Sequence, residues 1–241
     1  MTFHLMRLQP DAKALAAWAT RHDVLSPDGD YGYALHGLLC AAFGEQAPKP
    51  FRYLGGRQGL LAYTEAGLDV LRMNARLATP DVARALGLND FDAREFPIIW
   101  KSGQMLGFEV RVRPVVRAKD GRERDALLHA ICDIPAEENG GMSQRAAIYS
   151  EWLSKQFTAD DAASIIEAQM DAFSLTRVLR KDGAGENGKR KTRAVTGPDV
   201  VFKGRMQVGN SEAFARLLAR GVGRHRAFGF GMLLLKPASS C

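Results

Sequence analysis

Cysteine is scarce and scattered in this sequence. The chain of 241 residues has three cysteines, Cys40, Cys132 and Cys241, and it contains no CxxC pair, no HExxH motif and no cluster of cysteine with histidine. Structural zinc needs such clustered ligands, and a disulfide framework needs an even set of closely spaced cysteines. The sequence therefore predicts no metal, no cofactor and no disulfide framework.

Long hydrophobic runs are also missing. The longest apolar stretches, residues 34–43 and 228–235, are interrupted by His36 and by glycines. Both are shorter than the roughly 20 residues that a membrane-spanning helix needs. Residues 1–8 lack the basic start and apolar block of a secretory signal. We therefore predict a soluble, cytoplasmic protein without a membrane partner.

Charge is unevenly distributed along a chain of ordinary composition, with 46% apolar and 25% charged residues. Residues 176–226 contain 13 Lys and Arg against four acids, a net charge of +9, while the remainder carries −3. A surface made positive by one segment favours a polyanionic partner, although a solvated basic face is an equally good reading of charge alone.

Turn signals divide the first half of the chain into short elements. Asp28-Gly29-Asp30 indicates a helix start capped by Asp30, and Gly55–Gly59 predicts a hairpin turn. The predicted elements are a strand at 2–8, a helix after Pro10, a helix at 31–43, strands at 51–54 and 60–64, one or two helices over 65–88 and an extended segment near 91–99.

The same order of elements then begins again. Alternating apolar and charged residues predict a half-buried strand over Met105–Arg117. Periodicity favours a helix in the first half of 162–180, and residues 182–192 (DGAGENGKRKT) predict a flexible basic loop. The other predicted elements are a polar surface excursion around 137–141, a helix at 143–157, an extended segment at 173–179, a strand at 200–208, a capped helix at 211–220 and a strand at 228–235.

Two successive βαββαβ units define an α+β fold of two tandem ferredoxin-like domains, the topology of RNA-recognition modules. We predict an N-terminal domain over residues 1–98, which contains the helix at 31–43. A C-terminal domain over 104–241 contains the basic loop and a glycine-rich tail. Many unrelated enzymes share this topology, so the fold alone assigns no function.

Tyr33 and His36 are the candidate reactive pair. They lie three residues apart on the predicted helix and therefore share a face. At about 100° per residue, the core-facing stripe of this helix is Leu35, Leu38, Leu39 and Ala42. Gly37, beside His36, is expected to leave room for an approaching group. A lone histidine is more often structural, but this one lies off the apolar stripe and beside a phenol.

The tail, GVGRHRAFGFGMLLLKP at residues 221–237, is rich in glycine. It is not a dinucleotide-binding fingerprint, because Arg226 stands where the third glycine belongs and because the segment follows a helix. Two readings stay open. The glycines allow another chain to approach closely, with Arg224, His225 and Arg226 supplying charge, or they form a tight helix–strand connection, which the residues alone favour.

Four segments occur together, in chain order: YALHGLLCAAFG (33–44), PxPFRYL (48–54), DVVFKGRMQVGNSEAF (199–214) and the tail. The tail pattern G-x-G-x-x-[RK]-A-x-G-x-G-x-L is the most specific, and it is filled by Gly221, Gly223, Arg226, Ala227, Gly229, Gly231 and Leu233. Together these segments resemble the CasE family, the repeat-specific endoribonuclease subunit of type I-E CRISPR systems. Residues 118–145 carry little of the resemblance.

This resemblance implies two ferredoxin-like domains and a role in antiviral CRISPR defence. It implies cleavage of CRISPR precursor RNA at the 3′ base of each repeat hairpin, which produces mature crRNA. It further implies that the product stays bound and that the chain joins other subunits of the Cascade complex. The catalytic histidine of the family maps onto His36, and the tyrosine one turn before it maps onto Tyr33.

Metal-independent RNA cleavage requires the 2′-OH to attack the scissile phosphate, which leaves a 2′,3′-cyclic phosphate and a 5′-OH. Histidine, titrating near pH ~6.5, can serve as the acid or the base. We expect His36 to transfer the proton and Tyr33 to orient the sugar or phosphate. Contacts to hairpin RNA are expected from ten basic residues: Arg177, Arg180, Lys189, Arg190, Lys191, Arg193, Lys203, Arg205, Arg224 and Arg226.

Two other classes of function stay open at this point. A catalytically silent subunit would use the same basic surface only to anchor a hairpin RNA, and the presence of His36 with Tyr33 argues against it. A ferredoxin-like enzyme or partner module for a small metabolite would need a convergent acidic or cofactor motif, which the sequence lacks. Co-purifying RNA, visible in the ratio of absorbance at 260 and 280 nm, would separate these classes.

Overall fold

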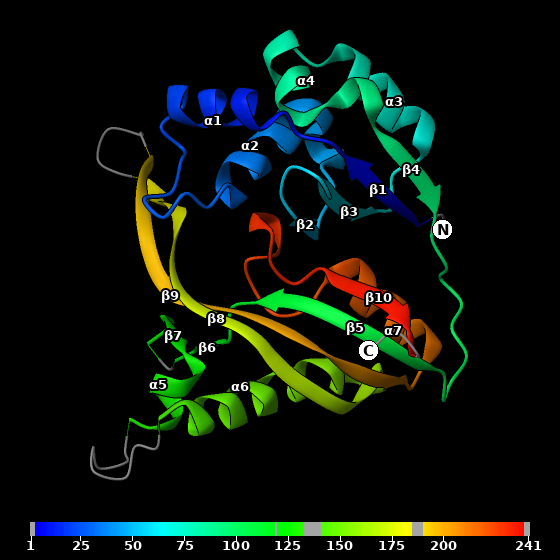
Figure 1. Cartoon of the computed structure of the whole chain (residues 1–241), viewed down its shortest axis with the longest axis vertical. Coiled ribbons are helices and arrows are strands. Elements are labelled where there is room, and N and C mark those ends of the chain that lie inside the picture. The colour runs from blue at the N-terminus through cyan, green and yellow to red at the C-terminus, as the bar shows by residue number, and fades with distance from the viewer. Residues whose placement is uncertain (1–2, 119, 133–140, 185–189, 239–241) are drawn as a thin grey trace. The chain divides into compact units, whose positions relative to one another are not determined.

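The chain contains two four-stranded β-sheets. A computed structural model describes residues 3–118, 120–132, 141–184 and 190–238. The residues group into two compact units. Figure 1 colours the chain by residue number, from blue at the N-terminus to red at the C-terminus. Unit 1 consists of Met1–Pro97, Thr176–Thr196 and Arg226–Gly229; unit 2 consists of Ile98–Leu175, Gly197–His225 and Phe230–Cys241. The sequence-based division at 98–104 stays a prediction, and two segments that it places in the second domain group with unit 1.

The sheet of unit 1 has the order β2-β3-β1-β4, and the strand pairs β1–β3, β1–β4 and β2–β3 are antiparallel. Four helices lie over one face of this sheet (Figure 1). The elements are β1 (His4–Leu8), α1 (Ala12–Arg21), α2 (Gly32–Phe43), η1 (Gly44–Gln46), β2 (Phe51–Tyr53), β3 (Leu60–Thr64), α3 (Leu68–Leu77), α4 (Pro80–Leu86), η2 (Leu88–Asp90) and β4 (Asp92–Glu95). Their apolar faces share one core, which includes Met6, Leu15, Leu38 and Leu86.

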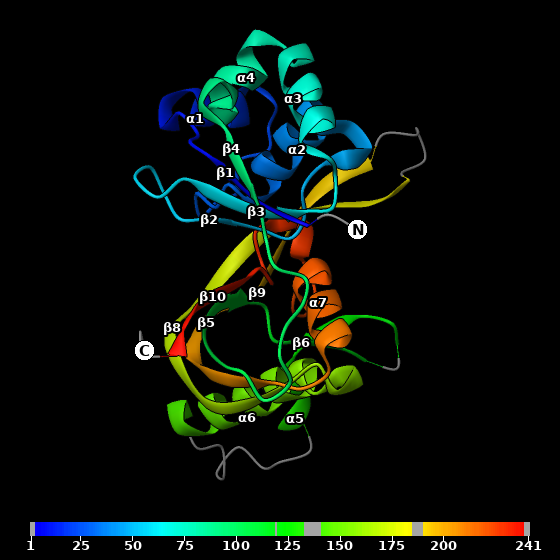
Figure 2. The same cartoon turned by 90° about the vertical axis from the view of Figure 1, so that its right-hand side faces the viewer.

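The sheet of unit 2 repeats the pattern with the order β10-β5-β9-β8 (Figure 2). Its elements are β5 (Met105–Val112), α6 (Gly141–Phe157), η4 (Ala159–Asp161), β8 (Ala163–Ala184), β9 (Arg190–Val208), α7 (Ser211–Arg220) and β10 (Leu233–Pro237). The 3₁₀ turn η5 (Arg226–Phe228) groups with unit 1. A small insertion adds β6 (Val115–Arg117), β7 (Glu123–Asp125) and α5 (Ala126–Ala130). Buried aromatic rings fill the core; Phe108 and Phe157, for example, lie with centroids 5.2 Å apart.

The predicted fold class, two ferredoxin-like βαββαβ units, is confirmed by both sheet orders. Local capping follows the sequence at α7 and differs from it at α2. The Asn210 side chain accepts from the amide of Ala213 at the start of α7, and Gly221 ends that helix. At α2 the cap residue is Tyr31, while the Asp30 carboxylate accepts from the amide of Gly32 at 2.8 Å.

The prediction of a helix in the first half of 162–180 is wrong, because β8 runs as a strand from Ala163 to Ala184. Apolar residues in this stretch mimic helical spacing, but pairing with β9 decides the conformation, and tertiary pairing commonly overrides such local patterns. The predicted loop at 182–192 is also too long. The strands continue through Ala184 and resume at Arg190, and the residues between lie outside the described part.

Two predicted strands have different bounds in the structure. The strand at 105–117 is split into β5 and β6, and Pro114, which has no N–H to donate to a sheet, stands at the break. The strand at 228–235 begins only at Leu233, since Arg226–Phe228 forms a 3₁₀ turn and Gly229 and Gly231 have positive φ. The polar excursion predicted around 137–141 falls largely on residues outside the described part, and the segment before it contains β7 and α5.

Candidate active site

Helix α2 separates its side chains as the sequence predicts. Leu35, Leu38, Leu39 and Ala42 are buried in the core of unit 1. Tyr33 and His36 are partly exposed, and Cys40, one turn further, is exposed. The helix therefore presents a phenol, an imidazole and a thiol along one side.

Phe228, from the glycine-rich tail, is the aromatic partner of the Tyr33–His36 pair. Its ring stacks on Tyr33, with a centroid distance of 5.7 Å and an interplanar angle of 25°. The same ring meets His36 edge to face, at 5.3 Å and 86°. Such pairs each contribute about 0.5–1.5 kcal/mol beyond the burial of their area. One residue of the tail thus holds both candidate reactive rings.

Glycine at two positions permits this contact. A β-carbon at residue 32 would overlap the carbonyl oxygen of Phe228. Gly229 has a φ of +83°, and a β-carbon there would lie 3.3 Å from Cε2 of Phe51. Of the two readings of the tail, the structure supports a tight connection packed against this chain, because the tail turn η5 contacts α2 and β2 of unit 1.

The expectation that Gly37 leaves room beside His36 is wrong. A β-carbon at Gly37 would lie 3.2 Å from Cη2 of Trp18, so the indole of α1 occupies that space. Helical periodicity identifies which residues share a stripe, but the neighbour of that stripe is decided by how α1 packs on α2. Trp18 therefore covers the side of α2 beside Gly37.

Partial burial raises the pKa of the Tyr33 phenol and of the Cys40 thiol. Both groups consequently remain protonated near neutral pH and can donate hydrogen bonds. The positive charge of Lys49 opposes the shift at Cys40, which places its ammonium within electrostatic range of this end of α2.

Three residues of this site carry no role in the sequence-based assignment. Lys49 follows η1 and lies between Pro48 and Pro50. A cation between two prolines is the sequence feature that could have identified it as a candidate site residue. Phe228 stands within the tail motif, but only folding shows that it reaches α2. Cys40 lies one helical turn after His36, so the helical spacing already places it on the side of the helix that carries Tyr33 and His36.

Among the ten predicted RNA-binding residues, four form ion pairs within the protein. Lys203 binds Asp171 at 2.8 Å and Arg205 binds Glu167 at 2.6 Å, and both acids come from the neighbouring strand β8. Arg224 binds Glu123 at 2.6 Å, and Arg177 binds Asp28 at 2.6 Å. Acidic side chains therefore partly neutralise the positive charge of residues 176–226.

For the other six predicted RNA-binding residues, the structure describes the side chains of two. Arg193 is exposed on β9, and Arg226 is partly buried in η5. Lys189 lies outside the described residues, and Arg180, Arg190 and Lys191 lie on strands without a described side-chain position. The role of all ten residues in RNA binding stays a prediction.

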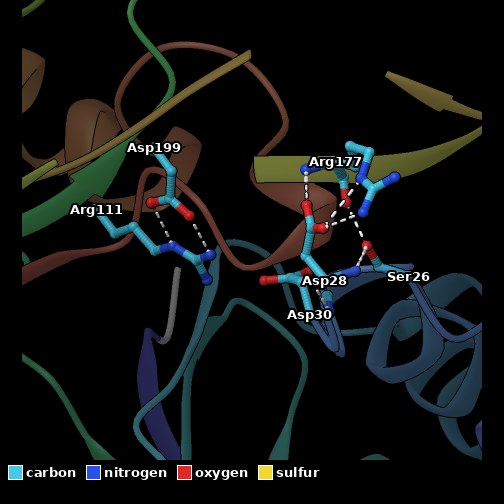
Figure 3. A network of polar contacts seen from close by, with 7 residues as sticks. Ser26, Asp28, Asp30, Arg111, Arg177 and Asp199 are labelled. Carbon is cyan, nitrogen blue, oxygen red and sulfur yellow. Dashed lines mark hydrogen bonds and ion pairs between the residues drawn. The ribbon is translucent and has the colours of Figure 1, made fainter. Parts of the chain in front are cut away.

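Arg177 is fastened to the loop before α2 (Figure 3). Its guanidinium donates to Oδ1 of Asp28, its amide donates to Oδ2 at 2.6 Å, and its carbonyl accepts from the Ser26 hydroxyl. Arg177 lowers the pKa of the Asp28 carboxyl through these bonds. These bonds join residue 177 of β8 to the segment that leads into α2.

Replacing Asp28 by alanine should loosen this junction. We expect the Arg177 amide to exchange its hydrogen several-fold faster, because it would lose the Asp28 carboxylate that accepts its hydrogen bond. The lowered pKa of Asp28 means that the contact is present above the ordinary carboxyl value of about 3.9 and is lost as the pH falls through the lower folded value. Hydrogen exchange followed by NMR measures both effects.

Asp69→Ala is the control for this junction, since Asp69 is exposed and pairs with Arg72 only at 3.9 Å. Its exchange rate at Arg177 should match the wild type. Equal exchange in Asp28→Ala and Asp69→Ala would show that the bonds of Asp28 do not secure β8.

Unit 2 contains a second polar cluster around Phe230. The Arg111 guanidinium pairs with Asp199, with Nε 2.8 Å from Oδ1, and lies 4.3 Å from the Phe230 ring centroid (Figure 3). Arg113 is 2% exposed and lies over the same ring at 5.5 Å. Burial of two arginines against an aromatic face and a carboxylate is a structural arrangement that anchors the last glycines of the tail.

No helix in the described residues is long and apolar enough to cross a bilayer. Within the same residues, no three side chains of histidine, cysteine, aspartate or glutamate gather as a metal site.

Fold and site together define a class: tandem ferredoxin-like proteins with a Tyr–His pair on a helix of the first unit, held by a glycine-rich tail. A family model described as CRISPR associated protein matches residues 3–237, so the chain belongs to this family of CRISPR-associated proteins. The predicted membership of the CasE family is confirmed. Among curated proteins, none matches significantly.

Solved structures of similar fold are CRISPR proteins. A CRISPR endoribonuclease Cse3 bound to a 19-nucleotide RNA is 20% identical, with 98% of each chain covered and a TM-score of 0.63. Thermus thermophilus Cse3 bound to an RNA representing a pre-cleavage complex is 19% identical, with 98% of this chain and all of that chain (100%) covered and a TM-score of 0.62. A chain of a CRISPR RNA-guided surveillance complex, pre-nicking, is 17% identical over 97% of this chain and 99% of that chain, with a TM-score of 0.56.

Proposed function

We propose that this protein is an endoribonuclease that cleaves CRISPR precursor RNA at the 3′ base of each repeat hairpin. The observation that carries the proposal is the Tyr33–His36 pair, held on α2 by Phe228, in a chain of the CRISPR-associated family. The similarity in fold to RNA-bound Cse3 supports an RNA substrate.

The reaction in this proposal is a transesterification that consumes no water and needs no metal. The 2′-oxygen of the nucleotide before the scissile bond attacks phosphorus, and the bond from phosphorus to the 5′-oxygen breaks. The 2′-OH loses its proton and the departing 5′-oxygen gains one, so the products are a 2′,3′-cyclic phosphate and a 5′-OH. His36 transfers one of these protons, as acid or as base.

Tyr33 and Lys49 have supporting roles in this reaction. Burial keeps the Tyr33 phenol protonated, so it donates a hydrogen bond to the sugar or to a phosphate oxygen. Lys49 supplies a positive charge at this end of α2, where it stabilises the negative charge that develops on the phosphorane. Neither residue needs to change its protonation state during the reaction.

A denaturing-gel assay with the host's repeat hairpin tests the proposal. In the presence of EDTA we expect one cut, complete loss of that cut with a 2′-deoxy substitution at the nucleotide before it, and a product that ends in a cyclic phosphate. Cleavage only after addition of Mg²⁺ would contradict the metal-independent reaction. Tight binding without a cut would instead favour the silent hairpin-binding subunit.

We further propose that the cleaved crRNA stays bound and that the chain is a subunit of a Cascade complex. The similarity to a chain of a surveillance complex supports this assignment. Co-purification from cells that express the other subunits tests it, with the crRNA repeat detected on the complex. Rapid release of the product under single-turnover conditions would contradict retention.

Because some of the basic residues are paired with acids, we expect them to contribute unequally to the salt dependence of RNA binding. Each phosphate contact changes the slope of log K against log salt by about 0.7–0.9. Arg193 is exposed and has no ion-pair partner among the described residues, so Arg193→Ala should flatten the slope by this amount. Arg205 is already neutralised by Glu167 through two hydrogen bonds, so Arg205→Ala should change the slope by less than half as much.

Filter binding at several salt concentrations measures these slopes. Arg72→Ala, on α3 and outside the proposed surface, is the control and should leave the slope unchanged. An Arg205→Ala slope as flat as that of Arg193→Ala would show that the Glu167 pair opens on RNA binding.

A further inference from the structure

Cys40 lies directly against the candidate catalytic imidazole. The two residues are one helical turn apart on α2. The Sγ atom is 3.7 Å from Nδ1 of His36 and 3.9 Å from Nε2, both within hydrogen-bonding range for sulfur. The contact joins two side chains on the same side of α2.

The chemistry of the pair assigns the donor. Partial burial raises the pKa of the Cys40 thiol, so the sulfur carries its proton near neutral pH. A neutral imidazole has one nitrogen without a proton, and this nitrogen is the acceptor available to the thiol. Both ring nitrogens lie within range of the sulfur, so whichever nitrogen is unprotonated can accept from the thiol.

The imidazole is thereby held by two different elements. Phe228, from η5, contacts the ring edge to face, and Cys40, from the helix of His36 itself, meets its nitrogens. Tyr33 lies on the same side of α2, and the positive charge of Lys49 acts on Cys40. An acid or base that must meet an RNA oxygen gains from such a restraint on its ring.

We propose that Cys40 is a positioning residue for His36. The thiol donates to the unprotonated ring nitrogen and thereby favours the neutral form of the ring. This inference rests on the proposed function for its effect on cleavage, whereas the Cys40–His36 contact itself does not.

The first test needs no RNA. The titration of the His36 ring is followed by NMR in the wild type, in Cys40→Ala and in Cys40→Ser. Loss of a hydrogen bond to the neutral ring should move the midpoint of the His36 titration upward by about 0.3–1 pH unit in Cys40→Ala. Serine keeps a donor at the same place, so Cys40→Ser should remain near the wild-type midpoint.

The second test is the cleavage rate as a function of pH. We expect Cys40→Ala to cleave about 10-fold more slowly, with its near-neutral limb displaced in the same upward direction, and Cys40→Ser to restore both. The control is Cys132→Ala, since Cys132 is also an exposed cysteine but bonds only to the carbonyl of His129 among the described residues. That variant should match the wild type in every measurement.

The outcomes separate this inference from the proposed function. An unchanged midpoint in Cys40→Ala, or equal losses in Cys40→Ala and Cys40→Ser with both variants folded, would overturn the positioning role. If the wild type does not cleave the repeat hairpin, the proposed function fails, while the midpoint shift of the His36 titration still reports the contact. Circular dichroism and the melting temperature establish that the variants are folded.

Discussion

Cleavage of the repeat hairpin should fall by about 10²–10⁴-fold when His36 is replaced by alanine, while the affinity for the hairpin remains close to that of the wild type. In the proposed reaction the imidazole moves the proton, a task suited to a histidine side chain, so its loss removes proton transfer. Its contribution to binding is small, because the proposed phosphate contacts come from the basic residues. The near-neutral limb of the pH–rate profile should disappear in the variant.

Single-turnover rates and filter binding, measured with one RNA, separate the two effects. His129→Ala is the control, because His129 is exposed on α5 of unit 2 and should leave both quantities unchanged. A His36→Ala variant with the wild-type rate and pH profile would remove His36 from the reaction. A parallel loss of rate and affinity would instead assign it to RNA binding.

The second large effect is expected at Gly32, which carries no functional group. Gly32→Ala places a methyl group against the carbonyl oxygen of Phe228, and this nearest atom is backbone, which cannot move aside as the end of a flexible side chain can. Overpacking of this kind costs about 1–3 kcal/mol, partly offset by the roughly 1 kcal/mol by which alanine favours a helix over glycine. Displacement of the tail removes Phe228 from Tyr33 and His36, so cleavage should slow by about 10- to 100-fold.

Gly56→Ala provides the matched control for this substitution. A β-carbon at Gly56 meets nothing within 4 Å, so the same change of residue adds no overlap there. Its melting temperature and cleavage rate should stay near those of the wild type. A Gly32→Ala variant with normal cleavage would show that the tail does not hold the reactive pair.

The Tyr33–His36–Phe228 arrangement connects these two predictions. In the proposed reaction His36 transfers the proton, and Phe228 of the tail is the ring that both Tyr33 and His36 contact. A proton-transfer group must be held close to its working geometry, since misplacement by about 1 Å can cost 100-fold in rate. The glycines of the tail therefore matter through the position that they allow Phe228 to take.

The sequence by itself determined the elements that depend on local patterns. Apolar spacing placed Leu35, Leu38 and Leu39 in the core and left Tyr33 and His36 on another face, because every residue of a helix turns by a constant angle. The repeated order of strands and helices likewise determined the two ferredoxin-like sheets. Asn210 and Gly221 marked the ends of α7 through their own hydrogen-bonding and backbone preferences.

Only the tertiary structure decided the contacts between segments distant in the chain. The space beside Gly37 is filled by Trp18, Phe228 reaches α2 across almost the whole sequence, and Glu167 and Asp171 neutralise cations on the adjacent strand. The stretch 163–172 became a strand because β9 offers it a partner. Local patterns describe which way a side chain faces along its own element, whereas its neighbour and its charge balance depend on which other element folds against it.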